Sequence, residues 1–384
     1  MALFTPRIAI LLTFFAFGVM VGSNVGAFPI LIKQASVSPF AFGIMGGLGM
    51  LANIIAMSIG GWINRHFDHR SVILTVLPMA FLAMCYTLIV GSLLSYAVSV
   101  IMFSYMLGTT DLFMNAEGAA VEQELGKPVF SSYHGMASLG MALFAIISSL
   151  ISTWYGPLFV VLPALAPVIM AWMAVFQTIP HRELEKHKDV PQKIILPRKI
   201  LAFIGIAAGL NVSCELAAIQ WAGQLLTQIA PQFAAYSGLG LAFYGLCGGT
   251  MRMFGDRLRA RFGDMRLMIV SLSVAIVGFF ALSLAPGFWI SVIAFAAVGC
   301  GLGIIFPCLF SFAGKLVPDA KAAAMAFVIT VGGFPRVVFP WLLGWLAQNY
   351  SLSAVFAACV VVASTALVII VGTFAKADAA VVKP

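Results

Sequence analysis

The sequence predicts an all-α polytopic membrane protein with twelve transmembrane helices in two six-helix bundles. Of its 384 residues, 62% are hydrophobic and only 9% are charged, whereas a soluble domain carries about 25% charged residues. The apolar residues fall into runs of about 20 or more, the length that crosses a hydrocarbon core of ~30 Å. Glycine and basic motifs recur in the two halves of the chain, which predicts the division into two bundles.

Charged and turn-forming stretches cut the chain into twelve apolar runs. They are 8–33, 38–62, 72–93, 95–121, 133–154, 156–179, 199–226, 232–253, 266–285, 287–313, 321–347 and 352–375. The first run is too long for the apolar core of a signal peptide and lacks a small-residue cleavage site, so we expect it to stay as the first helix.

The basic residues orient the predicted helices. With the N-terminus in the cytoplasm, only Lys33 lies on the outer side and only Arg336 lies within a helix. The other 19 of the 21 Lys and Arg residues (21 − 2) lie on the cytoplasmic side or at the helix ends of that side. This bias predicts an inner-membrane protein with both termini in the cytoplasm. Although the net charge is +8, the basic residues form short clusters between apolar runs, and we expect no nucleic-acid partner.

A charged stretch at mid-chain predicts the domain boundary. We expect an N-terminal bundle over 1–179, a cytoplasmic linker over 180–198 and a C-terminal bundle over 199–384. The two predicted bundles share a motif, because GVMVGSN at Gly18–Asn24 aligns with GLNVSCE at Gly209–Glu215. Such repetition is typical of transporters that rock two bundles about a central site.

Each half also carries a basic turn after its second helix, GGWINRHFDHRSVIL from Gly60 and GDRLRARFGDMRLMI from Gly255. These turns resemble the signature cytoplasmic loop of the major facilitator superfamily. Arg65 stands where the family usually has Asp, and Asp68 where it has Gly, so the first turn departs from the family pattern at these two positions. The resemblance implies a cytoplasmic gate, for which the candidates are Arg65, Arg70, His134, Asp256, Arg257 and Arg261.

Three further stretches resemble a bacterial branch near the fucose-permease-like transporters and the membrane proteins of rhizopine clusters. They are DLFMNAEGAAVEQELGKPVFSSYHGMASLG from Asp111, CELAAIQW from Cys214 and GLGIIFPCLFSFAG from Gly301. The resemblance implies the major facilitator fold and transport of a small polar solute such as a sugar, polyol or cyclitol. Leu216 and Gln220 replace the Gly and Asp of the branch, which weakens any inference about the substrate.

Ionisable residues deep in predicted helices are the candidates for proton coupling. Each costs about 2.5–3.5 kcal/mol at the bilayer centre on insertion scales, so it usually faces a cavity or a partner. Asp111 and Glu215 qualify by depth, and Glu117 lies nearer the cytoplasmic end. A carboxyl among apolar helices can bind a proton from one side and release it on the other. The fucose-permease-like transporters also place an acid on helix four, as Asp111 would be.

Polar residues on the same helices are the candidates for the substrate cavity. Asn115 shares a helix face with Asp111, as Asn211 does with Glu215. The other candidates are Asn24, Gln220, Trp221 and Arg336. Gln220 lies roughly opposite Asn211 on a straight helix, so both face inward only if that helix bends. Trp221 could stack on a sugar ring or anchor the helix at the interface. Arg336 could form a static pair with Asp111 or Glu215.

His134 could pair with Glu117 or Glu122 at the gate, and the Gly301–Gly303 pair predicts close helix packing. The six cysteines lie in apolar runs without metal-ligand spacing, and we expect no metal and no cofactor.

The leading function is proton-coupled transport of a small polar solute by a monomer. A proton-antiport exporter of drugs or metabolites is the alternative, although helix five lacks the Gly-Pro motif that such exporters carry. An intramembrane enzyme would need a deep His or a nucleophile motif, neither of which occurs in the sequence, and a sensor usually adds a soluble tail.

Overall fold

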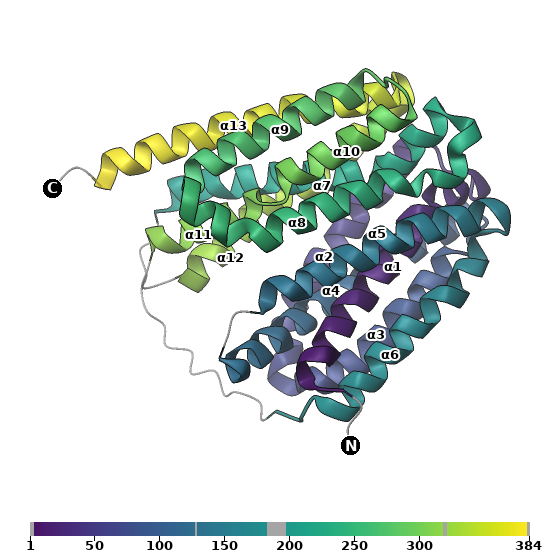
Figure 1. Ribbon diagram of the computed structural model, residues 1–384, viewed down its shortest axis with the longest axis horizontal. Helices are drawn as coiled ribbons and strands as arrows, with labels where there is room; N and C mark the ends of the chain where they lie inside the picture. The colour runs from purple at the N-terminus through teal and green to yellow at the C-terminus, as the bar shows by residue number, and fades with distance from the viewer. Residues whose placement is uncertain (1–3, 127–128, 183–196, 318–320, 382–384) are drawn as a thin grey trace.

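The computed structural model describes residues 4–126, 129–182, 197–317 and 321–381, which form helices joined by short connections, without a strand (Figure 1). The first half contains α1 (Pro6–Gln34), α2 (Pro39–His66), α3 (His69–Thr87), α4 (Leu93–Leu125), α5 (Phe130–Trp154), the 3-10 turn η1 (Pro157–Val160) and α6 (Val161–Thr178). The second contains α7 (Arg198–Ile229), η2 (Pro231–Tyr236), α8 (Gly238–Phe262), α9 (Asp264–Ser283), α10 (Phe288–Leu302), α11 (Ile305–Leu316), α12 (Lys321–Asn349) and α13 (Leu352–Val381). The all-α prediction is confirmed.

Polar side chains set where the first four helices begin. Thr5, Ser38, Asp68 and Ser92 precede α1 to α4, and each side chain accepts a hydrogen bond from a backbone N–H of the first turn. Such caps satisfy N–H groups that have no partner within the helix. These short polar residues therefore end each connection within a few residues.

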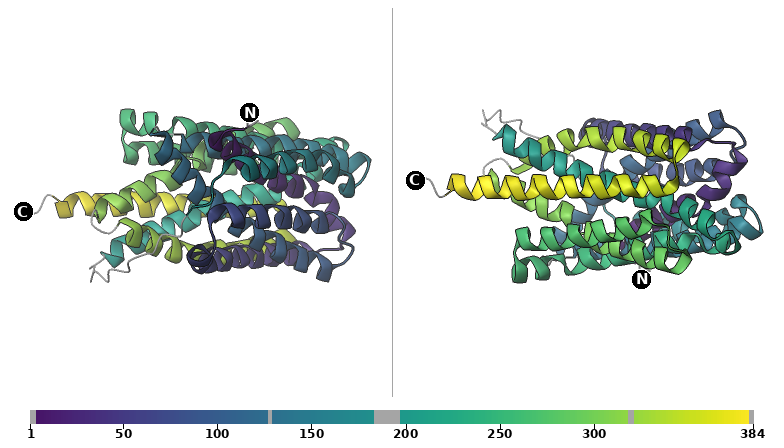
Figure 2. Two further views of the ribbon diagram at one scale, coloured as in Figure 1. Left: turned by 90° about the horizontal axis from the view of Figure 1, so that it is seen from below. Right: turned by 90° about the horizontal axis from the view of Figure 1, so that it is seen from above.

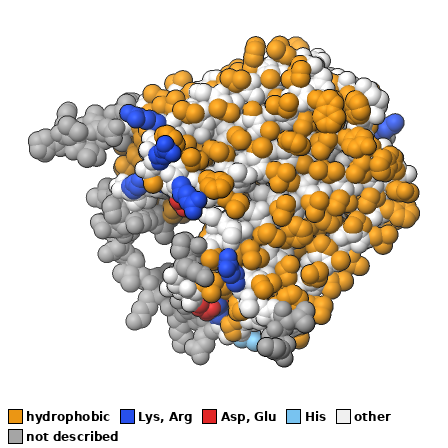
Figure 3. Space-filling view, viewed as in Figure 1, with side chains coloured by type: hydrophobic (Ala, Val, Ile, Leu, Met, Phe, Trp, Pro, Cys, Tyr) orange, Lys and Arg blue, Asp and Glu red, His pale blue; other side chains and the backbone are white. Residues whose placement is uncertain are grey.

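The charged residues gather at one end of the bundle (Figure 3). The start of α1, the end of α13 and the ends of α2, α4, α6, α8 and α11 lie at this basic end (Figure 1). The connections that follow α1, α3, α5, α7, α9 and α12 lie at the other end, here termed the opposite end. Lys33 is exposed there, beside exposed aromatic side chains that include Trp154, Tyr155 and Trp289. Aromatic belts of this kind are typical of membrane interfaces.

Eleven segments among the described residues are long and apolar enough to cross a membrane, counting α10 and α11 as one. The pass that is missing from these eleven is α8, whose 25 residues reach about 37 Å at 1.5 Å per residue. Its length fits a span, but Arg252, Asp256, Arg257, Arg259 and Arg261 make it too polar to be recognised by apolarity alone. The connections at its two ends lie at opposite ends of the bundle (Figure 1).

Glycines at equivalent positions bring together the same pair of passes in each half. A Cβ on Gly18 of α1 would lie 2.0 Å from the Ala137 carbonyl oxygen of α5, and one on Gly209 of α7 would lie 2.5 Å from the Gly332 carbonyl oxygen of α12. Only glycine permits such close approach. The first and fifth passes of one half therefore pack as the first and fifth passes of the other do, in agreement with the alignment of Gly18 with Gly209.

The two halves meet through α2 with α12 and through α5 with α8. At the opposite end the Phe40 N–H donates to Gln348 Oε1 at 3.2 Å, and the Ser149 hydroxyl donates to the Ala235 carbonyl at 3.0 Å. From there the two sets of helices diverge toward the basic end (Figure 1). In views from below and above, the helices of both halves run along one common direction and α13 projects past them (Figure 2).

The tenth pass is broken, so the expectation of one helix over 287–313 is wrong. α10 ends at Leu302 and α11 begins at Ile305. A Cβ on Gly303 would lie 2.7 Å from the Gly248 carbonyl oxygen of α8, and this close approach accompanies the break. The expected close packing is present, since a Cβ on Gly301 would lie 2.5 Å from the Ser271 carbonyl oxygen of α9.

Candidate functional site

An ion pair between Glu215 of α7 and Arg252 of α8 lies inside the second half. Arg252 Nη2 donates to Glu215 Oε2 at 3.0 Å, and the Asn211 amide donates to Glu215 Oε1 at 2.9 Å. The Glu215 side chain is 14% exposed and that of Arg252 35%. Each carboxylate oxygen of Glu215 thus has a donor, as a charged group at this depth requires.

The break between α10 and α11 positions Arg252. Its Nε donates to the Gly303 carbonyl at 3.1 Å, a group that lies where the regular helical hydrogen bonding is interrupted. The carbonyl and the Glu215 carboxylate hold the two sides of one guanidinium, which matches its planar fork of donors. The sequence does not single out Arg252, because it lies only three residues before the basic turn that begins at Gly255.

The pair faces a cavity of about 500 Å³ near the basic end, between the two halves. Its first wall is α5, and its second is made by α7, α8 and the start of α11. The lining residues are Phe130, Ser131, His134, Val212, Glu215, Arg252, Gly255, Asp256, Arg259, Ile304, Phe306 and Pro307. A cavity between two bundles that contains a charged pair is the usual setting of a transport site.

Asp111 lies near the middle of α4 with a different environment. The Asn115 amide donates to its Oδ1 at 2.8 Å and to its backbone carbonyl at 2.7 Å. Within the described ranges, Asp111 forms no ion pair. Gly118, on the same face of α4, lies close to Tyr133 of α5 and Ile10 of α1. Asp111 is therefore a carboxyl with an amide donor and without a cationic partner.

Glu117 is held in a network at the basic end of the first half. Its side chain is fully buried, and it accepts hydrogen bonds from His69 Nδ1 at 3.1 Å and from Arg182 Nε at 3.0 Å. His69 Nε2 faces Asn64 Oδ1 at 2.8 Å, so both ring nitrogens of His69 face oxygen atoms. Arg182 also pairs with Glu124. These partners make Glu117 a fixed anchor in this conformation.

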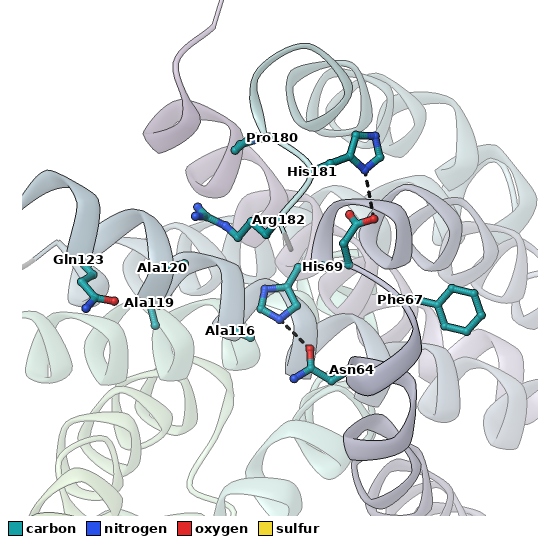
Figure 4. A pocket seen from close by; sticks show the side chains of 11 residues that line it. Asn64, Phe67, His69, Ala116, Ala119, Ala120, Gln123, Pro180, His181 and Arg182 are labelled. Atoms are coloured by element: carbon teal, nitrogen blue, oxygen red, sulfur yellow. Dashed lines mark hydrogen bonds and ion pairs between the residues drawn. The ribbon is translucent and has the colours of Figure 1, made fainter. Parts of the chain in front are cut away.

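The Glu117 network borders a cavity of about 660 Å³ that belongs to the first half alone (Figure 4). In it, Asp68 accepts a hydrogen bond from His181 Nδ1 at 3.1 Å. Although burial raises the pKa of Asp68, the hydrogen bonds from Ser71 and His181 prevail and lower it below its usual value. The hydrogen bonds to Glu117 and Glu124 raise the pKa of Arg182 above its usual range. The network ties the residues after α6 to α3 and α4.

The expected pair of Arg336 with Asp111 or Glu215 is wrong for this conformation. Arg336 Nε donates to the Gly332 carbonyl and Nη2 to the Ile329 carbonyl, both at 3.1 Å within α12. Glu215 has Arg252 as its cation instead. Arg252, which the sequence places at the cytoplasmic end of the predicted run 232–253, lies inside α8. Carbonyls near the start of the Gly332-Gly333 segment supply the acceptors that Arg336 needs.

The expected pairing of His134 with Glu117 or Glu122 is also wrong. The Glu122 carboxylate accepts the Val129 and Phe130 N–H groups that begin α5, and Glu117 is bound in its own network. The His134 ring packs edge-on against Phe14, with 5.1 Å between ring centroids, and lines the cavity of the Glu215–Arg252 pair. Glu122 therefore binds the start of α5 instead of His134.

The predicted substrate residues fall into two groups. Asn24 and Asn211 are buried, and the Oδ1 atom of each lacks a hydrogen-bond partner among the described residues. Gln220 and Trp221 lie nearer the opposite end, where Gln220 borders Gly46 of α2. Trp221 is 2% exposed and lies between the halves, so the interfacial-anchor interpretation is wrong. α7 is one continuous helix.

The predicted gate residues lie apart in this conformation. The Arg70 guanidinium donates to the Phe176 carbonyl at 2.8 Å and contacts His181. Arg257 and Arg261 lie over Phe254 and Phe262 of their own helix. The remaining two, Arg65 and Asp256, are exposed. The gate therefore stays a prediction about a second conformation.

Comparison with known proteins gives a consistent result. Residues 119–340 and 201–383 match the profile of the Major Facilitator Superfamily. An uncharacterised transporter of that type from Yersinia pestis is 24% identical over 84% of this chain and 86% of its own length. The membrane protein MosC of Rhizobium meliloti is 21% identical, over 90% of this chain and 84% of its own length.

Solved structures of low sequence identity share the fold. A structure of the nucleoside transporter NupG superposes with a TM-score of 0.78 at 13% identity, covering 96% of this chain and all of the other. A structure of a D-xylose–proton symporter superposes with a TM-score of 0.72 at 11% identity, covering 94% and 97%. At these identities the likeness shows the fold alone.

Proposed function

We propose that this chain, which belongs to the Major Facilitator Superfamily, couples proton movement to the transport of a small, neutral polar solute by alternating access. Membership of that superfamily makes it a multi-pass membrane transporter that moves a small solute. The proton and the class of solute are the proposal. The observation that carries it is the Glu215–Arg252 pair in the cavity between the halves.

Glu215 can pair with the Arg252 guanidinium or bind a proton, and the two states exclude each other. When Glu215 is ionised, Arg252 neutralises it at 3.0 Å. When Glu215 takes a proton, Arg252 loses its counter-ion and keeps only the Gly303 carbonyl. Each state favours a different arrangement of α7, α8 and α11, so proton binding can bias the equilibrium between two conformations.

Asp111 is the second carboxyl of the proposal. Its only side-chain partner in the described part of the chain is the Asn115 amide, so no cation neutralises Asp111 in this conformation. We place proton transfer on at least one of Asp111 and Glu215, one in each half. Glu117 is the weaker candidate because His69 and Arg182 already hold it.

A neutral solute fits the remaining polar groups. The Asn24 and Asn211 amides have oxygen atoms without partners in the described chain, and an unpartnered buried acceptor costs about 1–3 kcal/mol. Hydroxyl groups of a sugar, polyol or cyclitol would satisfy them. Arg336 donates its hydrogen bonds to carbonyls of its own helix, so it does not need an anionic substrate as a partner.

The basic end faces the cytoplasm in this proposal, because Lys and Arg are retained on that side of an inner membrane. The conformation described above is then inward-facing, with the halves joined at the periplasmic end. We further propose that the chain acts as a monomer, with the bundles 1–179 and 199–384 rocking about the linker 180–198. Residues 183–196 of that linker lie outside the described residues.

The test is uptake of neutral sugars, polyols and cyclitols into proteoliposomes, with and without an inward proton gradient. Asp111→Asn should abolish proton-driven accumulation and spare solute exchange, because the amide keeps the shape and cannot titrate. Glu215→Gln should do the same or weaken solute binding. Arg266→Gln, which neutralises an exposed charge of α9 outside both cavities, is the control. Accumulation by both amide variants against a gradient, with wild-type pH dependence, would rule out both carboxyls.

A further inference from the structure

A further pocket with polar lining lies between the halves at the opposite end. It measures about 290 Å³ and shares no lining residue with the Glu215 cavity. The residues that line it are Pro29, Ile32, Pro39, Phe42, Trp221, Gln224, Thr227, Gln228, Ala347 and Leu352. We term it the outer pocket. Both halves contribute to it, so it changes shape whenever they move.

One stripe of α7 carries unused hydrogen-bonding atoms into this region. Trp221 Nε1, both amide atoms of Gln224 and Thr227 Oγ1 are buried atoms without a partner among the described residues, as is Gln220 Oε1. Residues 220, 224 and 227 are spaced i, i+4, i+7 and share one helix face. Elsewhere in the described chain most buried side-chain hydroxyls bond to a carbonyl of their own helix, as Thr13 does to Ala9.

The composition of the outer pocket selects the chemistry of its ligand. Its lining has two amides, a hydroxyl and an indole N–H, and none of the lining residues is Asp, Glu, Lys, Arg or His. Trp221 adds an aromatic ring, packed edge-on at 5.0 Å from Phe42. Amides beside an aromatic face suit a neutral solute with several hydroxyl groups. The volume is at the lower end of the about 300–1,000 Å³ of small-molecule sites, which fits a single ring.

We propose that the outer pocket is a second binding subsite, which takes a neutral hydroxyl-rich solute from the periplasmic side before Trp221 and Phe42 separate. Gln224 and Thr227 bind the solute, and Trp221 with Phe42 closes the path to the Glu215 cavity. The proposal rests on the proposed function for the solute class and the orientation. It assigns Gln224 and Thr227 a role in recognition from one side only.

Sidedness gives the test. Gln224→Leu with Thr227→Val keeps the side-chain volume and removes the hydrogen bonds. With myo-inositol and D-xylose as probes, the KM for transport from the opposite end should rise about five- to tenfold, the loss expected for one or two hydrogen bonds. The KM for transport from the basic end should not change. The matched control is Gln34→Leu with Thr330→Val, which alters exposed side chains outside both cavities.

The outcomes separate this proposal from the proposed function. A KM unchanged from the opposite end, or raised equally from both ends, would overturn the outer subsite and leave proton-coupled transport intact. If wild-type protein transports neither probe, the proposed function fails for them, and saturation-transfer NMR of the same probes on detergent-solubilised protein decides the subsite. A signal lost in the double variant and kept in the control supports the subsite. A signal equal in both, or no signal with wild-type protein, overturns the subsite.

Discussion

Arg252 lies where one backbone carbonyl and one carboxylate are both within reach of its guanidinium. Gly303 supplies the carbonyl and Glu215 the carboxylate. The position of Glu215 and Asp111 near the middle of predicted membrane spans is enough to single them out, because a carboxyl at that depth is costly without a partner or a cavity. Position does not single out Arg252, since its partner at Gly303 is 51 residues away in the chain and becomes a neighbour only through the fold.

Replacing Arg252 tests the coupling role of the pair. In Arg252→Gln the Glu215 carboxylate loses its counter-charge, so we expect proton-driven accumulation to disappear while solute exchange continues. Since both side chains are partly exposed, the free energy of unfolding should fall by only about 1–3 kcal/mol. Accumulation assays in proteoliposomes and thermal unfolding in detergent measure the two effects.

Arg252→Lys and Arg266→Gln are the comparisons. A lysine keeps the charge but cannot bridge the carboxylate and the Gly303 carbonyl with one planar group, so it should restore accumulation in part. Arg266 is exposed on α9, and its neutralisation should change neither quantity. Full accumulation in Arg252→Gln would show that the ion pair is structural only.

At the scale of helices, glycine contacts rather than apolar length decide which elements pack. The runs read from the sequence agree with the helices to within a few residues at most ends, because apolar length reports a membrane span directly. Apolar length does not reveal the break at Gly303 or the full extent of α8. The break accompanies a close contact with Gly248, and the charged last third of α8 lowers its apolar content although the helix is regular.

The contact of α1 with α5 should tolerate no side chain at Gly18. A Cβ there would lie 2.0 Å from the Ala137 carbonyl oxygen, so Gly18→Ala must push the two helices apart, at a cost of about 1–3 kcal/mol. Gly372→Ala of α13 is the matched control, because nothing lies within 4 Å of its added Cβ. Thermal unfolding of purified protein should show a loss for the first variant alone, and equal stability would contradict the close contact.

At the scale of the molecule, the halves are joined at the opposite end and diverge toward the basic end. The two-bundle organisation could be predicted because Gly18 and Gly209 repeat together with the basic turns. The conformation could not be predicted. The contacts of α2 with α12 and of α5 with α8 differ between the two states of a transporter, and one sequence encodes the contacts of both states without showing which state is the more stable. For the same reason the gate at Arg70 and Arg261 stays a prediction.

Orientation has a direct check. In a variant without native cysteines, an impermeant thiol reagent applied to whole cells should label Gln34→Cys at the opposite end and miss Arg65→Cys at the basic end. Both parent side chains are exposed, so accessibility on the correct side is assured. Positions 186 and 380, which we also expect to be protected from outside, lie outside the residues whose side chains are described. The reverse pattern would invert the assignment of inward-facing geometry.

Proton movement linked to solute movement is the central claim, and it can be measured at once with a pH-sensitive dye outside proteoliposomes. Adding a transported neutral solute to wild-type protein, without any imposed gradient, should make the external medium more alkaline as protons enter with the solute. Asp111→Asn or Glu215→Gln should abolish this signal while labelled solute still exchanges. Uptake of solute by wild-type protein with no change of external pH, or an equal pH change in both amide variants, would contradict the account.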